Sequence, residues 1–278
     1  MANTRELRRR IKSVKNTSQI TRAMEMVAAV KMKKAQDQAV NGRPYSDNLS
    51  SALERLLPRV DLEAHPLLTG NGSTKVGIIL LTTDKGLVGA LNTNLVRTVI
   101  SAKLQNVIFY TVGKKGRSFV VRTEKQLVAD FENVDAISFR QAVQLSKIVI
   151  EAFRLLEVGE VILIYPQFIS TLRQEPNIVK LLPISLPLTT SDTSEFLFEP
   201  NIDTLLDALL IHHIQIKIYQ ALLETKASEH SSRMVAMKNA TDNAKELVSD
   251  LTLNYNQARQ DSITKEILEI ATASVAMQ

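Results

Sequence analysis

Two glycine-containing turns could bind phosphate, since each follows a segment that reads as a strand. The first is DKGLVGALN (84–92). A glycine-rich turn that enters a helix N-terminus can hold a phosphate with backbone N–H groups and the helix dipole. Its spacing, however, is only Gly-x-x-Gly, which is neither the P-loop nor the dinucleotide fingerprint. The favoured interpretation is a tight strand-to-helix turn in which glycines allow positive φ and close packing.

The second candidate is GKKGRS (113–118), which is basic but lacks the first glycine of a P-loop, which would precede Gly113 by five residues. We expect a solvated turn there. Other catalytic features are sparse. His212 and His213 are adjacent, whereas metal ligands on one helix face need a spacing of three or four residues, so only one of them can face the core. With four His and no Cys in 278 residues, we predict no catalytic residues, no metal site and no cofactor.

Charge is concentrated at the start of the chain. The net charge is +5, but residues 1–34 hold ten basic residues against two acids. An acidic partner should therefore meet this segment first. Its apolar pattern is regular and the segment also holds two Glu, and both features argue against an organelle transit peptide. Its apolar face consists of small residues and Thr, which suits another helix better than lipid. No aromatic residues interleave with the basic ones to stack on bases, which disfavours nucleic acid.

The positions of Gly and Pro indicate how the elements are arranged. All nine Gly and all eight Pro lie between residues 42 and 200, so the chain ends are free of the two strongest helix breakers. Steps of three and four residues then define a coiled-coil seam near each end. The C-terminal seam comprises Met234, Met237, Thr241, Ala244, Val248, Leu251, Tyr255 and Ala258. The N-terminal seam comprises Ile20, Ala23, Val27 and Val30, extended less cleanly upstream through Leu7, Ile11 and Val14.

The middle of the chain has an α/β pattern. Apolar, β-branched runs at 76–83, 107–112 and 161–165 alternate with helical patterns at 92–104 and 139–156. Such alternation predicts a largely parallel sheet buried on both faces. We therefore predict an α/β fold class: a long antiparallel coiled coil of N- and C-terminal helices plus a central α/β domain. The expected boundaries are 1–58, 74–195 and 201–278.

Four segments resemble ATP synthase gamma subunits. They are KSVKNTSQITRAMEMVAA (12–29), TDKGLVGALN (83–92), EHSSRMVAMKNATDN (229–243) and YNQARQDSITKEILEI (255–270). The likeness spans the whole chain and is most specific in the last two segments. It departs from the family pattern at Ala90, where Gly is usual, and at Val88, where some members have Cys.

This resemblance implies a rotor without an active site, from a bacterial source. The coil would lie in a bore formed by three alpha and three beta subunits, and the α/β domain would contact epsilon and the membrane ring of c subunits. Proton flow would turn the assembly at the cytoplasmic face of the cell membrane, with neither nucleic acid binding nor direct membrane insertion.

The resemblance also implies roles for individual residues. Met24 and Arg233 would face an acidic lever loop of beta. Arg259 and Gln260 would hydrogen-bond a second beta loop, with Thr264 and Glu266 near the same surface. Phe196, Phe198 and Glu199 would face the c ring. Two alternatives stay open: a nucleotide-binding α/β enzyme with helical oligomerisation arms, and a basic coiled-coil adaptor for nucleic acid.

Overall fold

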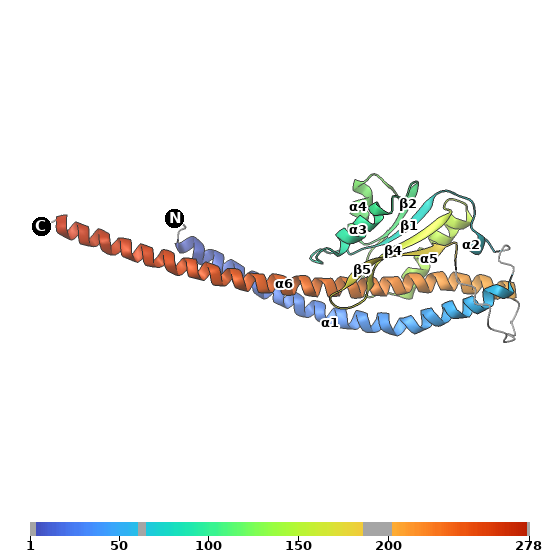
Figure 1. The fold of residues 1–278 in the computed structure, drawn as a ribbon, viewed down its shortest axis with the longest axis horizontal. Helices are drawn as coiled ribbons and strands as arrows, with labels where there is room; N and C mark the ends of the chain where they lie inside the picture. Colours follow the sequence, from blue (N-terminus) through green and yellow to red (C-terminus); the bar gives the residue numbers. More distant parts are fainter. Residues whose placement is uncertain (1–3, 61–64, 186–201, 277–278) are drawn as a thin grey trace. The chain divides into compact units, whose positions relative to one another are not determined.

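The computed structural model describes residues 4–60, 65–185 and 202–276. The chain divides into two compact units: Met1–Ala28 with Met234–Gln278, and Ala29–Arg233. The first unit contains the start of α1 (Thr4–Leu56) and the end of α6 (Ile202–Ala276). The second contains the rest of both helices and a mixed α/β region (Figure 1).

In the first unit, α1 and α6 run in opposite directions and pack along a seam (Figure 1). The predicted α6 seam is confirmed: Met237, Thr241 and Ala244 are buried, and Val248, Leu251, Tyr255 and Ala258 are half-buried. Thr21 and Thr241 hydroxyl oxygens are 2.8 Å apart, so the two helices also share a polar contact. The antiparallel coiled coil is thus present.

The predicted α1 seam is wrong over its main part. Ile20 is 60% exposed, Val27 58% and Val30 74%, and Ala23 is exposed as well. The buried or half-buried positions continue from the upstream set instead: Leu7, Ile11, Val14, Ser18, Thr21, Glu25 and Ala28. Ile20 lies two residues after Ser18, which places it about 200° around the helix. The prediction placed only apolar residues in the seam, whereas small side chains with hydroxyl groups, Ser18 and Thr21, occupy this part of it.

The second unit contains a five-stranded sheet in the order β3-β2-β1-β4-β5. Its strands are β1 (Val76–Leu81), β2 (Val107–Val112), β3 (Gln126–Phe131), β4 (Glu160–Phe168) and β5 (Gln174–Leu182). The first four strands pair in parallel, and β5 pairs with β4 antiparallel. The largely parallel sheet is therefore confirmed. The two strands that were not predicted, β3 and β5, are the edges.

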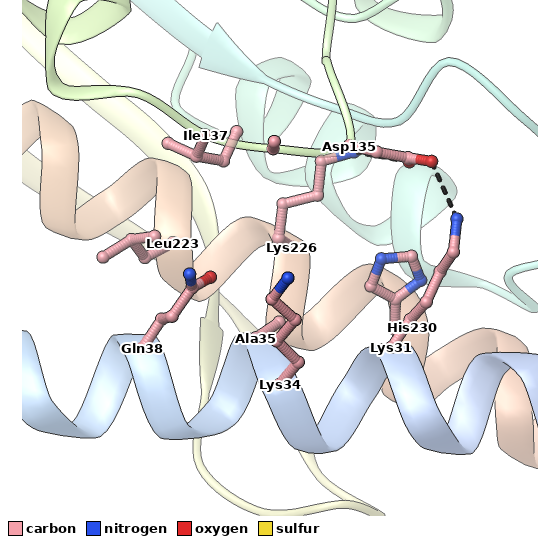
Figure 2. Close-up of a pocket in the computed structure, with 10 residues that line it drawn as sticks. Lys31, Lys34, Ala35, Gln38, Asp135, Ile137, Leu223, Lys226 and His230 are labelled. Atoms are coloured by element: carbon pink, nitrogen blue, oxygen red, sulfur yellow. Dashed lines mark hydrogen bonds and ion pairs between the residues drawn. The ribbon is translucent and has the colours of Figure 1, made fainter.

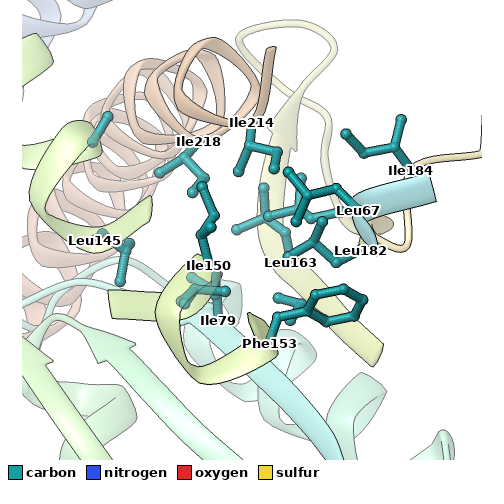
Figure 3. Packing of buried hydrophobic residues seen from close by; sticks show 14 of the residues in the cluster. Leu67, Ile79, Leu145, Ile150, Phe153, Leu163, Leu182, Ile184, Ile214 and Ile218 are labelled. Carbon is teal, nitrogen blue, oxygen red and sulfur yellow. The ribbon is translucent and has the colours of Figure 1, made fainter. Parts of the chain in front are cut away.

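Helices cover both faces of this sheet. The first face packs against α5 (Phe139–Arg154), the short α2 (Pro66–Thr69) and α6, as the side chains of Ile79, Leu163, Phe153 and Ile214 show (Figure 3). The second face packs against α3 (Leu91–Ser101) and α4 (Lys114–Arg122). Because both faces are covered, the central strands are continuous apolar runs, which is why they were recognisable in the sequence.

Helix α1 continues past the Gly- and Pro-free stretch, through Gly42 and Pro44, to Leu56, where the 3-10 turn η1 (Leu57–Arg59) follows. Proline has no N–H to complete the helical hydrogen bond of the preceding turn. Gln220 of α6 donates an amide hydrogen to the carbonyl of Ala39 at 2.8 Å, next to that gap. A Cβ on Gly42 would come within 2.6 Å of Gln220 Oε1. Glycine thus lets the two helices approach here.

Candidate functional site

The most unusual part of the second unit is a stretch of α6 that is buried on every side. All residues from Ala221 to Ser231 are buried, although seven of them are polar or charged: Glu224, Thr225, Lys226, Ser228, Glu229, His230 and Ser231. A helix normally turns its polar face to water. Buried polar groups need hydrogen-bond partners, so each should be matched by another part of the chain. We call this stretch, together with Ser232 and Arg233, the polar collar.

Three serines of the polar collar donate hydrogen bonds to loop or strand carbonyls. Ser228 donates to Pro166 O at 2.9 Å, Ser231 to Thr171 O at 2.6 Å, and Ser232 to Val88 O at 2.6 Å. Val88 lies in the turn after β1, and Pro166 and Thr171 lie at and after the end of β4. Helix α6 is therefore fastened to the carboxyl ends of two adjacent parallel strands.

Glu229 forms the charged centre of the polar collar. One of its oxygens accepts from Arg233 Nη2 at 2.8 Å, and the other accepts from Lys226 Nζ and Asn133 Nδ2, both at 3.2 Å. Lys226 Nζ also donates to Asn133 O at 3.0 Å, and Asn133 Nδ2 to Thr82 O at 2.7 Å. Buried charges are tolerated only when paired and hydrogen-bonded in this way. This network links α6 to β1 and to the loop after β3.

A second ion pair joins α1 to α6. Arg43 donates to one oxygen of Glu224, from Nη2 at 3.0 Å and from Nε at 3.2 Å, and Nη2 also donates to Phe168 O at 3.0 Å. The Glu224 side chain is 6% exposed. The pair therefore fixes α1 and α6 to the end of β4.

Two buried histidines on α6 are neutral at pH 7. Burial lowers the pKa of His213 to about 4, helped by the neighbouring charge of Lys217. Burial likewise lowers the pKa of His230 to about 4, although the Glu229 carboxylate opposes the shift. As predicted, only one residue of the adjacent pair faces the core: His213 is 6% exposed, while His212 is half-buried and lies 2.8 Å from Tyr45 OH. Neutral histidines add no charge to this packing.

The first glycine turn is a packing turn, as favoured from the sequence. Leu87 and Gly89 have positive φ, at 62° and 54°. Thr83 N donates to Asn92 Oδ1 at 3.2 Å and Asn92 Nδ2 donates to Thr83 Oγ1 at 2.8 Å, which closes the turn. A Cβ on Gly89 would stand 3.8 Å from Ser232 Oγ. The turn therefore packs directly against the polar collar.

The second glycine turn differs from the expected solvated turn, because Lys114 already begins helix α4. The first N–H groups of α4 are bonded within the chain. Lys114 N donates to Asp84 Oδ1 at 2.9 Å, Lys115 N to Thr83 O at 3.1 Å, and Gly116 N to Thr82 Oγ1 at 2.8 Å. A helix N-terminus binds phosphate through such N–H groups. Those of α4 already have acceptors in the segment after β1, so this turn supplies no phosphate site.

The residues expected to contact partners occupy different environments. Met24 is half-buried on α1, and Arg233 has a side chain only 11% exposed, because its guanidinium pairs with Glu229. Arg259, Gln260, Thr264 and Glu266 are exposed on α6, where Ser262 Oγ lies 3.4 Å from Glu266 Oε1. Phe196, Phe198 and Glu199 lie outside the described residues. Of the described residues in this set, Arg259, Gln260, Thr264 and Glu266 share one exposed stretch of α6.

Neither a metal-binding cluster nor a membrane-spanning helix is present in the part of the chain that the structure describes. No group of three or more His, Cys, Asp or Glu could hold a metal ion there. Among the same residues, no helix is long and apolar enough to cross a membrane. Of the polar collar, only Arg233 was predicted as a site residue. The only signal of the polar collar in the sequence is the nearly continuous run of polar residues from Glu224 to Ser232. Elsewhere on this helix, apolar and polar residues alternate with the helical period.

Comparison with known sequences gives full-length matches. A family profile described as ATP synthase matches residues 3–277. The ATP synthase gamma chain of Methylacidiphilum infernorum is 45% identical over 292 residues, covering 100% of both chains. That of Moorella thermoacetica is 42% identical over 282 residues, again covering 100% of both.

Comparison with solved structures agrees. In the mitochondrial ATP synthase of Tetrahymena thermophila, a chain of the central stalk and c-ring structure has a TM-score of 0.63 and 26% identity. The match covers 80% of this chain and 99% of that one. A chain of the Euglena gracilis enzyme, from the structure of its OSCP, F1 and c-ring, has a TM-score of 0.71 and 21% identity. It covers 99% of this chain and 94% of that one. The second likeness is evidence of fold.

Proposed function

Because the chain belongs to the ATP synthase gamma-chain family, as a non-catalytic rotor subunit of the central stalk, we propose that it turns inside a head of three alpha and three beta subunits. In this proposal proton flow through a c-subunit ring drives the rotation, and epsilon and the c ring contact the α/β region. The asymmetric coil is then a ligand whose orientation favours one conformation of each beta subunit over another.

A change of environment along one helix carries the proposal. Helix α6 is buried on all sides from Ala221 to Ser231, whereas every residue from Arg259 to Ala273 is exposed. The exposed stretch includes Ile263 at 43%, Ile267 at 60%, Leu268 at 58% and Ile270 at 71%. Exposed apolar patches of this kind mark interaction surfaces. The bore of the head supplies the complementary surface, and the relatives' central-stalk structures support that assignment.

The polar collar supports the mechanical half of the proposal. A shaft that transmits torque must not turn or slide within the domain that drives it. Three serine hydroxyl groups and the Glu229 network fasten α6 to the carboxyl ends of β1 and β4 and to the loop after β3. Rotation of α6 about its axis would break several of these bonds at once, and each buried group left unpaired costs about 1–3 kcal/mol.

The proposed partner contacts follow from exposure. Arg259 and Gln260 are exposed and available to a loop of beta, and an Arg fork pairs well with carboxylates. Thr264 and Glu266 extend this surface. Met24 and Arg233 are proposed to meet the acidic lever loop of beta, with Arg233 doing so while it is held by Glu229. Phe196, Phe198 and Glu199 keep their proposed role at the c ring. In a bacterium the assembly would be peripheral to the cytoplasmic face of the cell membrane.

Co-expression with matched alpha and beta subunits tests the proposal. We expect a purified complex of three alpha, three beta and one copy of this chain, with ATP hydrolysis that depends on the chain. Arg259→Ala combined with Gln260→Ala should lower turnover by at least roughly tenfold, since a hydrogen bond to a charged group contributes about 1.5–3 kcal/mol and about 1.4 kcal/mol is a factor of ten. Asn256→Ala, also exposed on α6, is the control and should leave turnover unchanged.

A head whose turnover is indifferent to the chain would contradict this function. Wild-type turnover by the double variant would contradict only the proposed contact of Arg259 and Gln260 with beta. Circular dichroism of both variants must first show unchanged helix content.

A further inference from the structure

A cavity of about 290 Å³ lies at the carboxyl edge of the sheet in the second unit. Helix α1 contributes Lys31, Lys34 and Gln38, helix α6 contributes Lys226 and His230, and the loop after β3 contributes Asp135. Figure 2 shows the Lys34 amine, the Gln38 amide and the His230 ring pointing into the space between α1 and that loop. We call it the lysine cavity.

Positive charge predominates among the groups that line the lysine cavity. Three lysines face a single carboxylate, that of Asp135. Asp135 Oδ2 accepts from Lys31 Nζ at 2.7 Å, and this hydrogen bond lowers the pKa of Asp135. Lys226 is also paired with Glu229, whose oxygen lies 3.2 Å away. The described structure gives Lys34 no such acid, so its ammonium group is the uncompensated charge of the cavity.

Several donor groups in the cavity have N–H bonds that are not used by the hydrogen bonds of the described structure. An ammonium group has three N–H donors. Lys226 uses two of them, for Asn133 O and Glu229 Oε2, and its contact with Asp135 Oδ1 is 3.8 Å, too long for a hydrogen bond. His230 adds another donor. Arg233 Nη1 lies 3.4 Å from His230 Nδ1, so Nδ1 accepts and the proton of the neutral ring is on Nε2.

We infer that the lysine cavity binds a small, multiply charged oxyanion of the inorganic phosphate type, held by Lys34 and Lys226. Lysines supply point charges suited to tetrahedral oxygens, whereas planar carboxylates are best matched by the fork of an arginine, and no arginine lines the cavity. The volume is just below the roughly 300–1,000 Å³ of cofactor pockets, and no Phe, Tyr or Trp among its lining residues could stack a base. A nucleotide is therefore disfavoured.

The inference rests on groups within the second unit and does not depend on the contacts proposed with alpha and beta. In the inferred site, Asp135 is the cavity's own counter-ion, and an incoming anion competes with it for Lys31 and Lys226. The direction of each change in anion affinity is therefore predicted: removing a lysine of the cavity weakens binding, and removing the Asp135 charge strengthens it. If the anion were only attracted to a basic surface, removing any neighbouring lysine would weaken binding to a similar extent.

The test uses the full-length chain, because the assembled head has phosphate sites of its own. The chain carries four His, so ¹³C-labelled histidine gives few signals, and His230 is assigned with His230→Gln. We expect inorganic phosphate to shift the His230 signal saturably at constant ionic strength, with no shift at His65. Lys34→Gln should weaken binding on the order of fivefold, the effect of one unit charge at about 4 Å in water.

Matched variants complete the design. Lys33→Gln removes a neighbouring charge that lies outside the cavity and pairs with Asp37 at 2.9 Å, and it should leave the affinity unchanged. Asp135→Asn should tighten binding, and ATP should bind no better than phosphate. The inference is overturned if no signal saturates, if Lys33→Gln and Lys34→Gln weaken binding equally, or if Asp135→Asn weakens it. Tighter binding of ATP would indicate a nucleotide site instead.

Discussion

Glu229→Gln is the sharpest test of the polar collar, because it removes a charge while keeping the side chain's shape. The carboxylate accepts three hydrogen bonds, from Arg233 at 2.8 Å and from Lys226 and Asn133 at 3.2 Å. A glutamine presents one oxygen and one NH₂ group. Whichever way the amide is oriented, its NH₂ group confronts an N–H donor where an acceptor stood.

The expected loss in the free energy of unfolding depends on how deeply Lys226 and Arg233, the cations that lose their carboxylate, are buried. Removing one partner of a buried ion pair costs about 3–5 kcal/mol. The Lys226 side chain is 4% exposed, but it keeps Asn133 O at 3.0 Å. The Arg233 side chain is 11% exposed and keeps Gly86 O at 3.5 Å. These remaining acceptors place the expected loss near the lower limit, at about 3 kcal/mol.

Thermal and urea unfolding of the full-length chain measure this loss. For a unit of about 200 residues, about 3 kcal/mol corresponds to a Tm lower by roughly 6–12 °C. Glu246→Gln, on an exposed position of the same helix, should change Tm by no more than about 1 °C. If Glu229→Gln also loses less than about 1 kcal/mol, the charge network does not hold α6, and the serine hydroxyl groups must do so alone.

Two further predictions concern pH and backbone conformation. The pKa values of His213 and His230, about 4 when folded against 6.5 in the reference state, mean that the unfolded chain binds protons more readily below pH 6.5. The free energy of unfolding should therefore be constant above pH 6.5 and fall as pH falls toward 4. In urea titrations at pH 5 and 7, His213→Leu should reduce this difference in unfolding free energy. An unchanged difference would contradict the lowered pKa of His213. Gly113 has a φ of 100° and a Cβ there would overlap the carbonyl of Thr82, so Gly113→Ala should destabilise the chain by several kcal/mol in urea titrations, whereas Gly86→Ala, with no neighbour within 4 Å, should change stability little. Equal stability of the two alanine variants would show that the Gly113 turn relaxes without cost.

The two long helices and the buried strands could be predicted because their signals are local. A stretch without Gly or Pro and with a period near 3.6 specifies a helix, and a continuous apolar run such as 76–81 specifies a central parallel strand. The edge strands lacked that signal. Strand β3 alternates between exposed and half-buried residues, and β5 contains Pro176, which is tolerated at an edge.

The part of the α1 seam from Ser18 to Ala28 and the polar collar could not be predicted, for a different reason. Thr21 belongs to the seam because its hydroxyl meets Thr241, which is 220 residues away. Glu229 is buried because Asn133, 96 residues earlier, comes from the loop after β3. Polarity alone assigns both residues to the surface. Their burial depends on partners that only the tertiary fold brings near, so periodicity within one segment cannot reveal it.

The polar collar also explains why a fold typical of nucleotide-binding proteins here serves a rotor. In open parallel α/β sheets, ligands bind outside the carboxyl ends of the strands, where the strand order reverses. In the order β3-β2-β1-β4 that point lies between β1 and β4. Ser232 bonds to Val88 O after β1, and Ser228 bonds to Pro166 O in β4, so α6 occupies the place of a ligand.

Three neighbouring features accompany this arrangement. The glycine turn after β1 packs against a helix instead of a phosphate. The N–H groups that begin α4 bond to Thr82, Thr83 and Asp84 instead of a ligand. The lysine cavity lies past the end of β3, away from the reversal point, and so α6 leaves room there for an anion. Helix α6 is hydrogen-bonded to the sheet at the position of a ligand and continues into the exposed stretch from Arg259 to Ala273, so one helix links the sheet to the surface that partners would contact.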